Sequence, residues 1–133
     1  MNDVIIDTNI VIWYFSQPKL PSTFAQEALD KALSDGAIFV TSITIVELTY
    51  LIEKNKIPPD IMSALVNAID NESSAIQLID LTRDIAERIS DIPRSIVADM
   101  PDRIIAATAL HLGLPLVTSD RDIQKLSDIN TIW

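Results

Sequence analysis

Short apolar runs alternate with longer stretches of helical periodicity along this chain. Val4–Ile6 predicts a first strand, and Thr8 or Asn9 begins the helix expected after it. The pattern over Ser22–Ser34 is helical and stops at Asp35-Gly36, a typical helix end. Further strands are expected at Ile38–Val40, Ala75–Ile79 and Leu114–Val117, with Asn130–Trp133 as a short edge strand; further helices are expected at Ile43–Lys54, from Pro58-Pro59 to about Ile69, and at Thr82–Ser90, Pro101–Leu112 and Asp120–Leu126.

This alternation predicts the α/β class. Parallel neighbouring strands need crossover connections, so we expect a three-layer α/β/α sandwich with a central parallel sheet of four or five strands. No linker, repeat or charge block divides the chain, and one domain over residues 1–133 is expected. Because ligands in such folds gather beyond the carboxyl ends of the strands, the residues that follow each strand matter most.

Composition narrows the function classes. The chain has 133 residues, no cysteine and a formal charge of −9. The missing cysteines exclude disulfides, thiol catalysis and Cys-ligated zinc, and they agree with the cytoplasmic location that we expect. No apolar run is long enough to span a bilayer, and no signal peptide is evident at the start. An acidic protein that binds nucleic acid must recruit divalent cations or expose a local basic rim.

Two aspartates directly follow predicted strands. Asp7 comes after Val4–Ile6, and Asp120 comes after Leu114–Val117 and Thr118-Ser119. Each is explained equally well as the N-cap of the next helix, a position that favours Asp. Thr118 and Ser119 could also offer hydroxyl groups to a ligand or a water molecule.

Glu47 is harder to explain as a structural residue. At helical spacing its neighbours include Ile43, Tyr50 and Leu51, so it lies on or beside the apolar stripe of its helix. A carboxylate there must be paired, metal-bound or protonated, since burial of an isolated charge is costly. No Lys or Arg lies within one turn of it, which favours a role in a site.

Asp102 opens the helix Pro101–Leu112, which is apolar almost all round and therefore expected to be buried. Asp99 could cap this helix, and Asp102 could interact with the helix dipole in the first turn. Both roles are compatible with a site, because a helix N-terminus at a sheet edge also borders a cleft.

If these four acids converge, their repulsion requires protonation or a cation. Oxygen ligands without His or Cys select Mg²⁺ or Mn²⁺, which can promote phosphodiester hydrolysis. The only histidine, His111, has no acidic neighbour at helical spacing, and two-histidine ribonuclease chemistry is excluded. Neither a phosphate-binding Gly-rich loop nor a dinucleotide fingerprint is present.

The chain resembles the PIN-domain family, and within it the VapC-type toxins of toxin–antitoxin pairs. The resemblance rests on four motifs in this order: Asp7-Thr8-Asn9, Glu47, Asp102-Arg103-Ile104-Ile105-Ala106-Ala107 and Thr118-Ser119-Asp120. The resemblance covers essentially the whole chain. It implies strand order 3-2-1-4-5, a Mg²⁺ or Mn²⁺ site, endoribonuclease activity on RNA, a homodimer, and inhibition by a VapB-like antitoxin.

The resemblance also assigns residues. Asp7, Glu47, Asp102 and Asp120 match the catalytic and metal-binding acids of the family. Supporting positions match Thr8, Asn9, Asp99 and Thr118, with Asp122 as a supplementary acid. Apart from the resemblance, Arg103 and Arg121 are the first candidates for RNA contacts, followed by Lys125, Arg83 and Arg94, although a solvated surface charge is the more common role for each of them. The His-Arg pair common just before the Asp99 position is replaced by Val97-Ala98.

Two alternatives remain open on sequence grounds. A non-catalytic RNA- or protein-binding PIN domain would often lack one of the acids, and all four are present here. A phosphatase-like α/β domain that uses an aspartate nucleophile would carry a second acid two residues after the first, where this chain has Asn9. A receiver domain, the other form of this second alternative, would need an acidic pair at the first strand and a Lys after the last one, and neither is evident.

Overall fold

The computed structural model describes residues 1–133 and is built around five parallel strands in the order β3-β2-β1-β4-β5. The strands are β1 (Val4–Ile6), β2 (Ile38–Thr41), β3 (Ile76–Ile79), β4 (Leu116–Val117) and β5 (Thr131–Ile132). The predicted class, the parallel sheet and the strand order implied by the family resemblance are all confirmed. None of the helices is long and apolar enough to cross a membrane.

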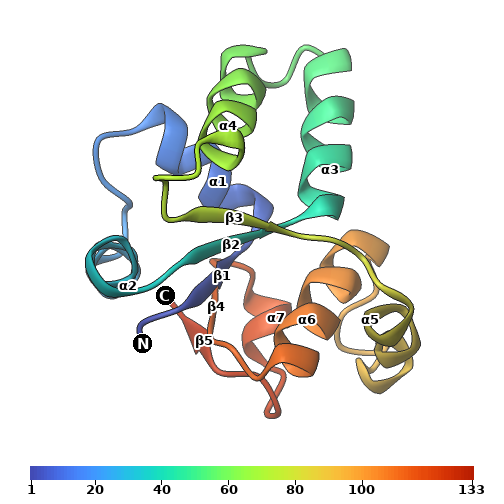
Figure 1. Ribbon diagram of the computed structural model, residues 1–133. Coiled ribbons are helices and arrows are strands. Elements are labelled where there is room, and N and C mark those ends of the chain that lie inside the picture. The colour runs from blue at the N-terminus through green and yellow to red at the C-terminus, as the bar shows by residue number, and fades with distance from the viewer.

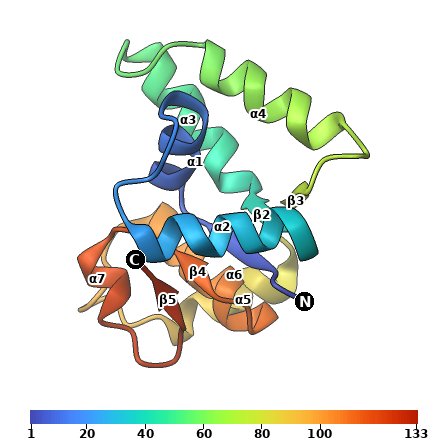
Figure 2. The same cartoon turned by 90° about the vertical axis from the view of Figure 1, so that its left-hand side faces the viewer.

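Helices cover both faces of the sheet (Figure 1). They are α1 (Thr8–Ser16), α2 (Thr23–Asp35), α3 (Ser42–Glu53), α4 (Asp60–Asp70), α5 (Arg83–Arg88), the 3-10 turn η1 (Ile89–Asp91), α6 (Met100–Leu112) and α7 (Arg121–Gln124). Helices α1 to α4 pack on one face and α5 to α7 on the other. Figure 2 shows α2 lying across the sheet, between α1 and the termini.

Successive side chains of β1 point to opposite faces of the sheet and so contribute to two different hydrophobic cores. Val4 and Ile6 point into the core that contains α1 to α4, whereas Ile5 points into the core that contains α5 to α7. A strand buried on both faces must be apolar throughout, as all three residues of β1 are. This burial fixes the position of the polar residues that follow the strand.

Some predicted boundaries were wrong, for local reasons. Leu114 and Pro115 lie outside β4, since Pro115 has no N–H to donate to the ladder, although its carbonyl oxygen accepts from Ile5. The helix expected over Thr82–Ser90 ends at Arg88 and tightens into η1, because Pro93 holds Ile92 in an extended conformation. The last helix is one turn, α7, with Asp120 as its cap rather than its first residue.

Candidate active site

The sheet reverses its strand order between β1 and β4, and polar residues follow both strands. Asp7 comes directly after β1 and Thr118 directly after β4. These two strands are parallel neighbours, so their carboxyl ends lie at the same edge. Such a reversal opens the crevice in which α/β proteins bind ligands. Asp7 is buried there, with only 3% of its surface exposed.

Hydrogen bonds fix both oxygens of the Asp7 carboxylate. The backbone N–H of Thr8 donates to Oδ1 at 2.8 Å, and the Thr118 hydroxyl donates to Oδ2 at 2.7 Å. Burial raises the pKa of Asp7, the two hydrogen bonds oppose that rise, and the negative charge of Asp120 adds to it. Asp7 is thus the N-cap of α1 and a member of an acidic cluster at once.

Glu47 reaches this edge from α3 without any cationic partner. Its Oε1 accepts a hydrogen bond from the Thr8 hydroxyl at 2.6 Å, and none of the ion pairs in the structure involves it. Burial raises the pKa of Glu47, and the charges of Asp7 and Asp99 raise it further. A hydroxyl group therefore provides part of the compensation that the apolar position of Glu47 demands.

Asp102 stands in the first turn of α6, whose residues Ile104–Ala109 are buried as predicted. The pKa of Asp102 is raised to about 7, first by burial and then by the charges of four nearby carboxylates: Asp7, Asp120, Asp99 and Glu47. Asp99 precedes α6 and is exposed, but its side chain makes no capping hydrogen bond. The other three predicted acids and Asp99 therefore all lie close enough to Asp102 for their charges to raise its pKa.

Asp120 joins the cluster while it also caps α7. Its Oδ1 accepts from the backbone N–H groups of Asp122 and Ile123, at 2.8 Å and 3.0 Å. Its own N–H donates to the Thr118 hydroxyl at 3.0 Å. The capping and site interpretations of Asp120 are therefore compatible.

Two supporting candidates lie farther out. Asn9 is exposed in the first turn of α1 and makes no side-chain hydrogen bond within the protein. Asp122 is exposed and pairs with Lys125 at 3.2 Å. Their supporting roles stay predictions.

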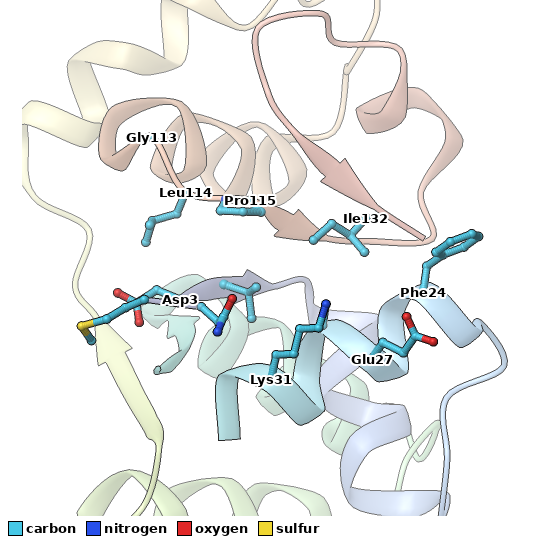
Figure 3. A pocket seen from close by; sticks show the side chains of 12 residues that line it. Asp3, Phe24, Glu27, Lys31, Gly113, Leu114, Pro115 and Ile132 are labelled. Carbon is cyan, nitrogen blue, oxygen red and sulfur yellow. The ribbon is translucent and has the colours of Figure 1, made fainter. Parts of the chain in front are cut away.

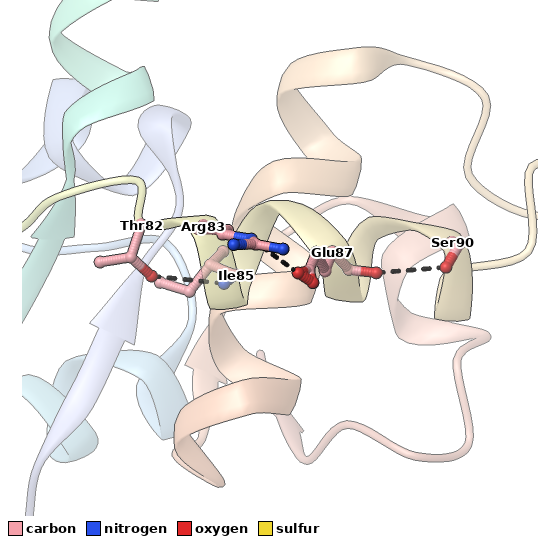
Figure 4. A network of polar contacts seen from close by, with 5 residues as sticks. All are labelled: Thr82, Arg83, Ile85, Glu87 and Ser90. Carbon is pink, nitrogen blue, oxygen red and sulfur yellow. Dashed lines mark hydrogen bonds and ion pairs between the residues drawn. The ribbon is translucent and has the colours of Figure 1, made fainter.

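The basic candidates differ in what they contact. Arg103 uses one terminal nitrogen to donate to the carbonyl oxygens of Ile89 and Ile92, both at 3.0 Å, which favours a structural role over RNA contact. Arg83 pairs with Glu87 along α5 at 3.0 Å (Figure 4). Arg121 and Arg94 are exposed and form no ion pair. Arg121 is next to Asp120 in sequence, and its role in substrate binding stays a prediction.

The donor set fits a hard divalent cation in its chemistry. It is made of carboxylate and hydroxyl oxygens. Burial first, and then the charges of neighbouring acids, raise the pKa values of Asp7, Glu47 and Asp102, and a bound cation would neutralise those charges. As the side chains stand, however, no three of them are arranged to hold one ion. Mg²⁺ commonly binds through one or two carboxylates and keeps several waters, so the site suits that ion without forming a closed cage.

The most prominent cavity lies elsewhere. It measures about 510 Å³ and is lined by α2 and by the segments that enter β1 and β4, among them Lys31, Asp3 and Pro115 (Figure 3). It therefore lies towards the amino-terminal edge of the sheet, opposite the acidic cluster. None of Asp7, Glu47, Asp102 and Asp120 lines this cavity.

Two buried threonines near the cluster were missed on sequence grounds. Thr44 and Thr41 are 0% and 2% exposed, and their hydroxyls lie 3.4 Å apart. The Thr44 hydroxyl also lies 2.9 Å from that of Thr8. A signal was present in the three-residue spacing of Thr41, Thr44 and Glu47, which places Thr44 and Glu47 on one side of α3 and Thr41 at the N-cap of that helix.

Comparison with known proteins agrees with this geometry. The family model described as PIN domain matches residues 4–129, almost the entire chain. The chain belongs to the PIN domain family. This PIN domain is 27% identical over 125 residues to a curated relative named Ribonuclease VapC22, from Mycobacterium tuberculosis, and the match covers 94% of this chain and 92% of the relative.

Solved structures share the fold. A toxin–antitoxin complex from Klebsiella pneumoniae is 25% identical with a TM-score of 0.60, and the match covers 95% of this chain and 94% of that one. VapBC2 from Rickettsia felis, solved with a DNA fragment from its promoter, is 17% identical with a TM-score of 0.73, and covers 97% and 96%. The predicted family resemblance is thus confirmed.

Proposed function

We propose that this PIN domain is an endoribonuclease that hydrolyses RNA phosphodiester bonds with Mg²⁺ or Mn²⁺, and that it is the toxin of a toxin–antitoxin pair. The observation that carries the proposal is the cluster of Asp7, Glu47, Asp102 and Asp120, none of which has an ion-pair partner. A structural cluster of acids would be expected to contain its own cations. The similarity to a curated VapC ribonuclease supports the choice of RNA as substrate.

The chain supplies positioning and a concentrated negative charge. Thr118 and the Thr8 N–H hold Asp7, and the Thr8 hydroxyl holds Glu47, so two acids are fixed before any ligand binds. Asp7, Glu47, Asp102 and Asp120 would hold the divalent ion. When bound, that ion activates water for attack on phosphorus and stabilises the leaving oxygen. Preorganised groups of this kind need no rearrangement during the reaction.

Substrate binding must overcome the charge of −9. A bound cation neutralises part of the edge, and Arg121, exposed beside Asp120, offers a contact for a phosphate. Arg103 is the weaker candidate because its guanidinium already binds two backbone carbonyl oxygens.

The partner follows from the same relatives. Toxin–antitoxin complexes are among the structures that share this fold, and an acidic surface suits a small antitoxin with a basic segment. We expect such a VapB-like antitoxin to bind this chain. The homodimer stays a prediction, to be measured by light scattering of the purified protein.

The deciding experiment is cleavage of single-stranded RNA by protein freed of any antitoxin. Cleavage should occur with Mn²⁺ or Mg²⁺ and stop in excess EDTA. Asp7→Asn and Asp102→Asn should each lower the rate by about 100-fold or more, with the circular dichroism spectrum unchanged. Metal-independent cleavage, or near-normal rates in both variants, would remove the proposed mechanism; absence of any cleavage would favour a non-catalytic PIN domain.

A further inference from the structure

A chain of buried threonine hydroxyls leads from the end of β2 to Glu47. Thr44, in the first turn of α3, has no exposed surface, and its Oγ1 lies 2.9 Å from Oγ1 of Thr8. Thr8 Oγ1 in turn lies 2.6 Å from Oε1 of Glu47. Thr41, the last residue of β2, places its hydroxyl 3.4 Å from that of Thr44.

Counting hydrogens gives this chain a direction. A threonine hydroxyl has one hydrogen to donate and can also accept, whereas an ionised carboxylate only accepts. The Thr8 hydrogen is therefore used on Glu47, and the contact between Thr44 and Thr8 must use the hydrogen of Thr44. Thr44 is then free to accept from Thr41. The order of donation is Thr41 to Thr44 to Thr8 to Glu47.

Thr44 departs from what the hydroxyls of helical threonines usually do. Thr49 on the same helix donates to the carbonyl oxygen of Ile45 at 2.9 Å, one turn back, and Thr108 on α6 donates to that of Ile104 at 2.8 Å. These bonds stay within the helix. The Thr44 hydroxyl makes no such bond and contacts a residue of another helix that holds a site carboxylate.

We propose that Thr44 is a positioning residue for Glu47, acting through the hydroxyl of Thr8; this rests on the proposed function. By donating to Thr8, Thr44 keeps the Thr8 hydrogen on Oε1 of Glu47. The other oxygen, Oε2, forms no hydrogen bond within the protein and is left for a metal ion. Groups that orient a ligating side chain in this way typically change metal affinity or activity by about 10- to 100-fold when they are removed.

The test compares variants of the full chain by calorimetric titration with Mn²⁺, in the absence of RNA, and by RNA cleavage. Thr44→Val keeps the shape and removes the hydroxyl. It should weaken Mn²⁺ binding by about tenfold and lower kcat by a similar factor. Thr44→Ser should restore both, since it keeps the hydroxyl. Thr49→Val is the matched control on the same helix, and it should leave both quantities unchanged.

The variant Glu47→Gln tests whether Thr44 affects Mn²⁺ affinity by positioning Glu47 or by stabilising the whole domain. If Thr44 acts through Glu47, adding Thr44→Val to Glu47→Gln should cause no further loss of Mn²⁺ affinity. An equal loss in both backgrounds would overturn the proposal, as would wild-type Mn²⁺ affinity in Thr44→Val or failure of wild type to bind Mn²⁺. If Thr44→Val does not fold, Thr8→Val breaks the same chain one step later and should give the same loss.

Calorimetry keeps this inference distinct from the proposed function. Wild-type protein that binds Mn²⁺ but cleaves no RNA would contradict the ribonuclease activity alone. The role of Thr44 would still be decided by the Mn²⁺ affinities of the valine and serine variants.

Discussion

Thr118 donates its hydroxyl to Oδ2 of Asp7 across the point where the sheet reverses its strand order, at 2.7 Å. The two residues are 111 positions apart in sequence and are joined because β1 and β4 are neighbours. Thr118 has no exposed surface and also accepts from the N–H of Asp120. One hydroxyl thus links two site acids, and it can donate to Asp7 only while that oxygen remains an acceptor.

Thr118→Val should therefore damage both stability and cleavage. Valine has nearly the same shape but removes a hydrogen bond to a charged group, a contact worth about 1.5–3 kcal/mol when buried. The free energy of unfolding should fall by about that amount in urea. Cleavage should fall by about 10- to 100-fold, because Asp7 loses the partner that orients it.

Thr118→Ser is the control for this prediction, since it keeps the hydroxyl and removes only a methyl group. It should retain most of the cleavage rate. Equal cleavage by the valine and serine variants would mean that the hydroxyl does not orient Asp7.

The raised pKa of Asp102 makes stability depend on pH in the absence of metal. Burial and neighbouring acids raise its pKa to about 7 from the ordinary value of 3.8. Between these values the folded state binds more protons than the unfolded state, so stability is highest below the lower value and falls as pH rises through the upper one. In EDTA, the melting temperature should be higher at about pH 5 than at about pH 8.

The variant Asp102→Asn isolates this contribution, because it cannot titrate. Its melting temperature in EDTA should change less between the two pH values than that of wild type. Asp7 and Glu47, whose pKa values are also raised, should leave a smaller slope of the same sign. A wild-type melting temperature that rises over this range would contradict the repulsion inferred for the cluster.

Residues that follow strands were predictable, and residues that contact across elements were not. Asp7 and Asp120 follow apolar runs, and parallel strands bring their ends to one edge. Glu47 was predicted as a site residue from its place on an apolar stripe, and that role stays a prediction. No local pattern could show that the Arg103 guanidinium donates to the carbonyl oxygens of Ile89 and Ile92, since that contact depends on how the segment before α6 folds back.

Substitution of the two arginines proposed for RNA contact should have different effects on stability and on KM. Arg103→Met removes two hydrogen bonds at 3.0 Å and should lower the free energy of unfolding by about 1–3 kcal/mol, with little change in KM for RNA. Arg121→Met, at an exposed position, should leave stability nearly unchanged. It should raise KM and reduce the salt dependence of binding, because one phosphate contact is lost.

Urea unfolding and cleavage kinetics at two salt concentrations measure both effects. A higher KM for Arg103→Met with unchanged stability would indicate that Arg103 contacts the RNA and has no structural role. Unchanged KM and salt dependence for Arg121→Met would leave Arg121 as a solvated surface charge.

Asp120 offers the most direct test of metal binding, because its two roles depend on different properties. Its Oδ1 caps α7 by accepting from Asp122 and Ile123, and its charge raises the pKa values of Asp7 and Asp102. Asn keeps a capping oxygen and removes the charge, whereas Ala removes both. In EDTA, Asp120→Asn should therefore melt at least as high as wild type, and Asp120→Ala should lose about 1 kcal/mol relative to Asp120→Asn.

Addition of Mn²⁺ should reverse the order of wild type and Asp120→Asn. A cation at about 100 times its dissociation constant stabilises the native state by about 2.7 kcal/mol, which raises the melting temperature of a domain of this size by several degrees. The full gain belongs to wild type, since Asp120→Asn has lost one anionic ligand and binds the ion more weakly. The measurement is thermal unfolding at matched ionic strength, with Ca²⁺-free buffers and EDTA as the reference. An equal rise in melting temperature on adding Mn²⁺ to the two proteins would mean that Asp120 is a helix cap alone. A cap interacts with the helix N-terminus and its dipole, so its replacement by Asn would not change the stabilisation that a bound ion provides.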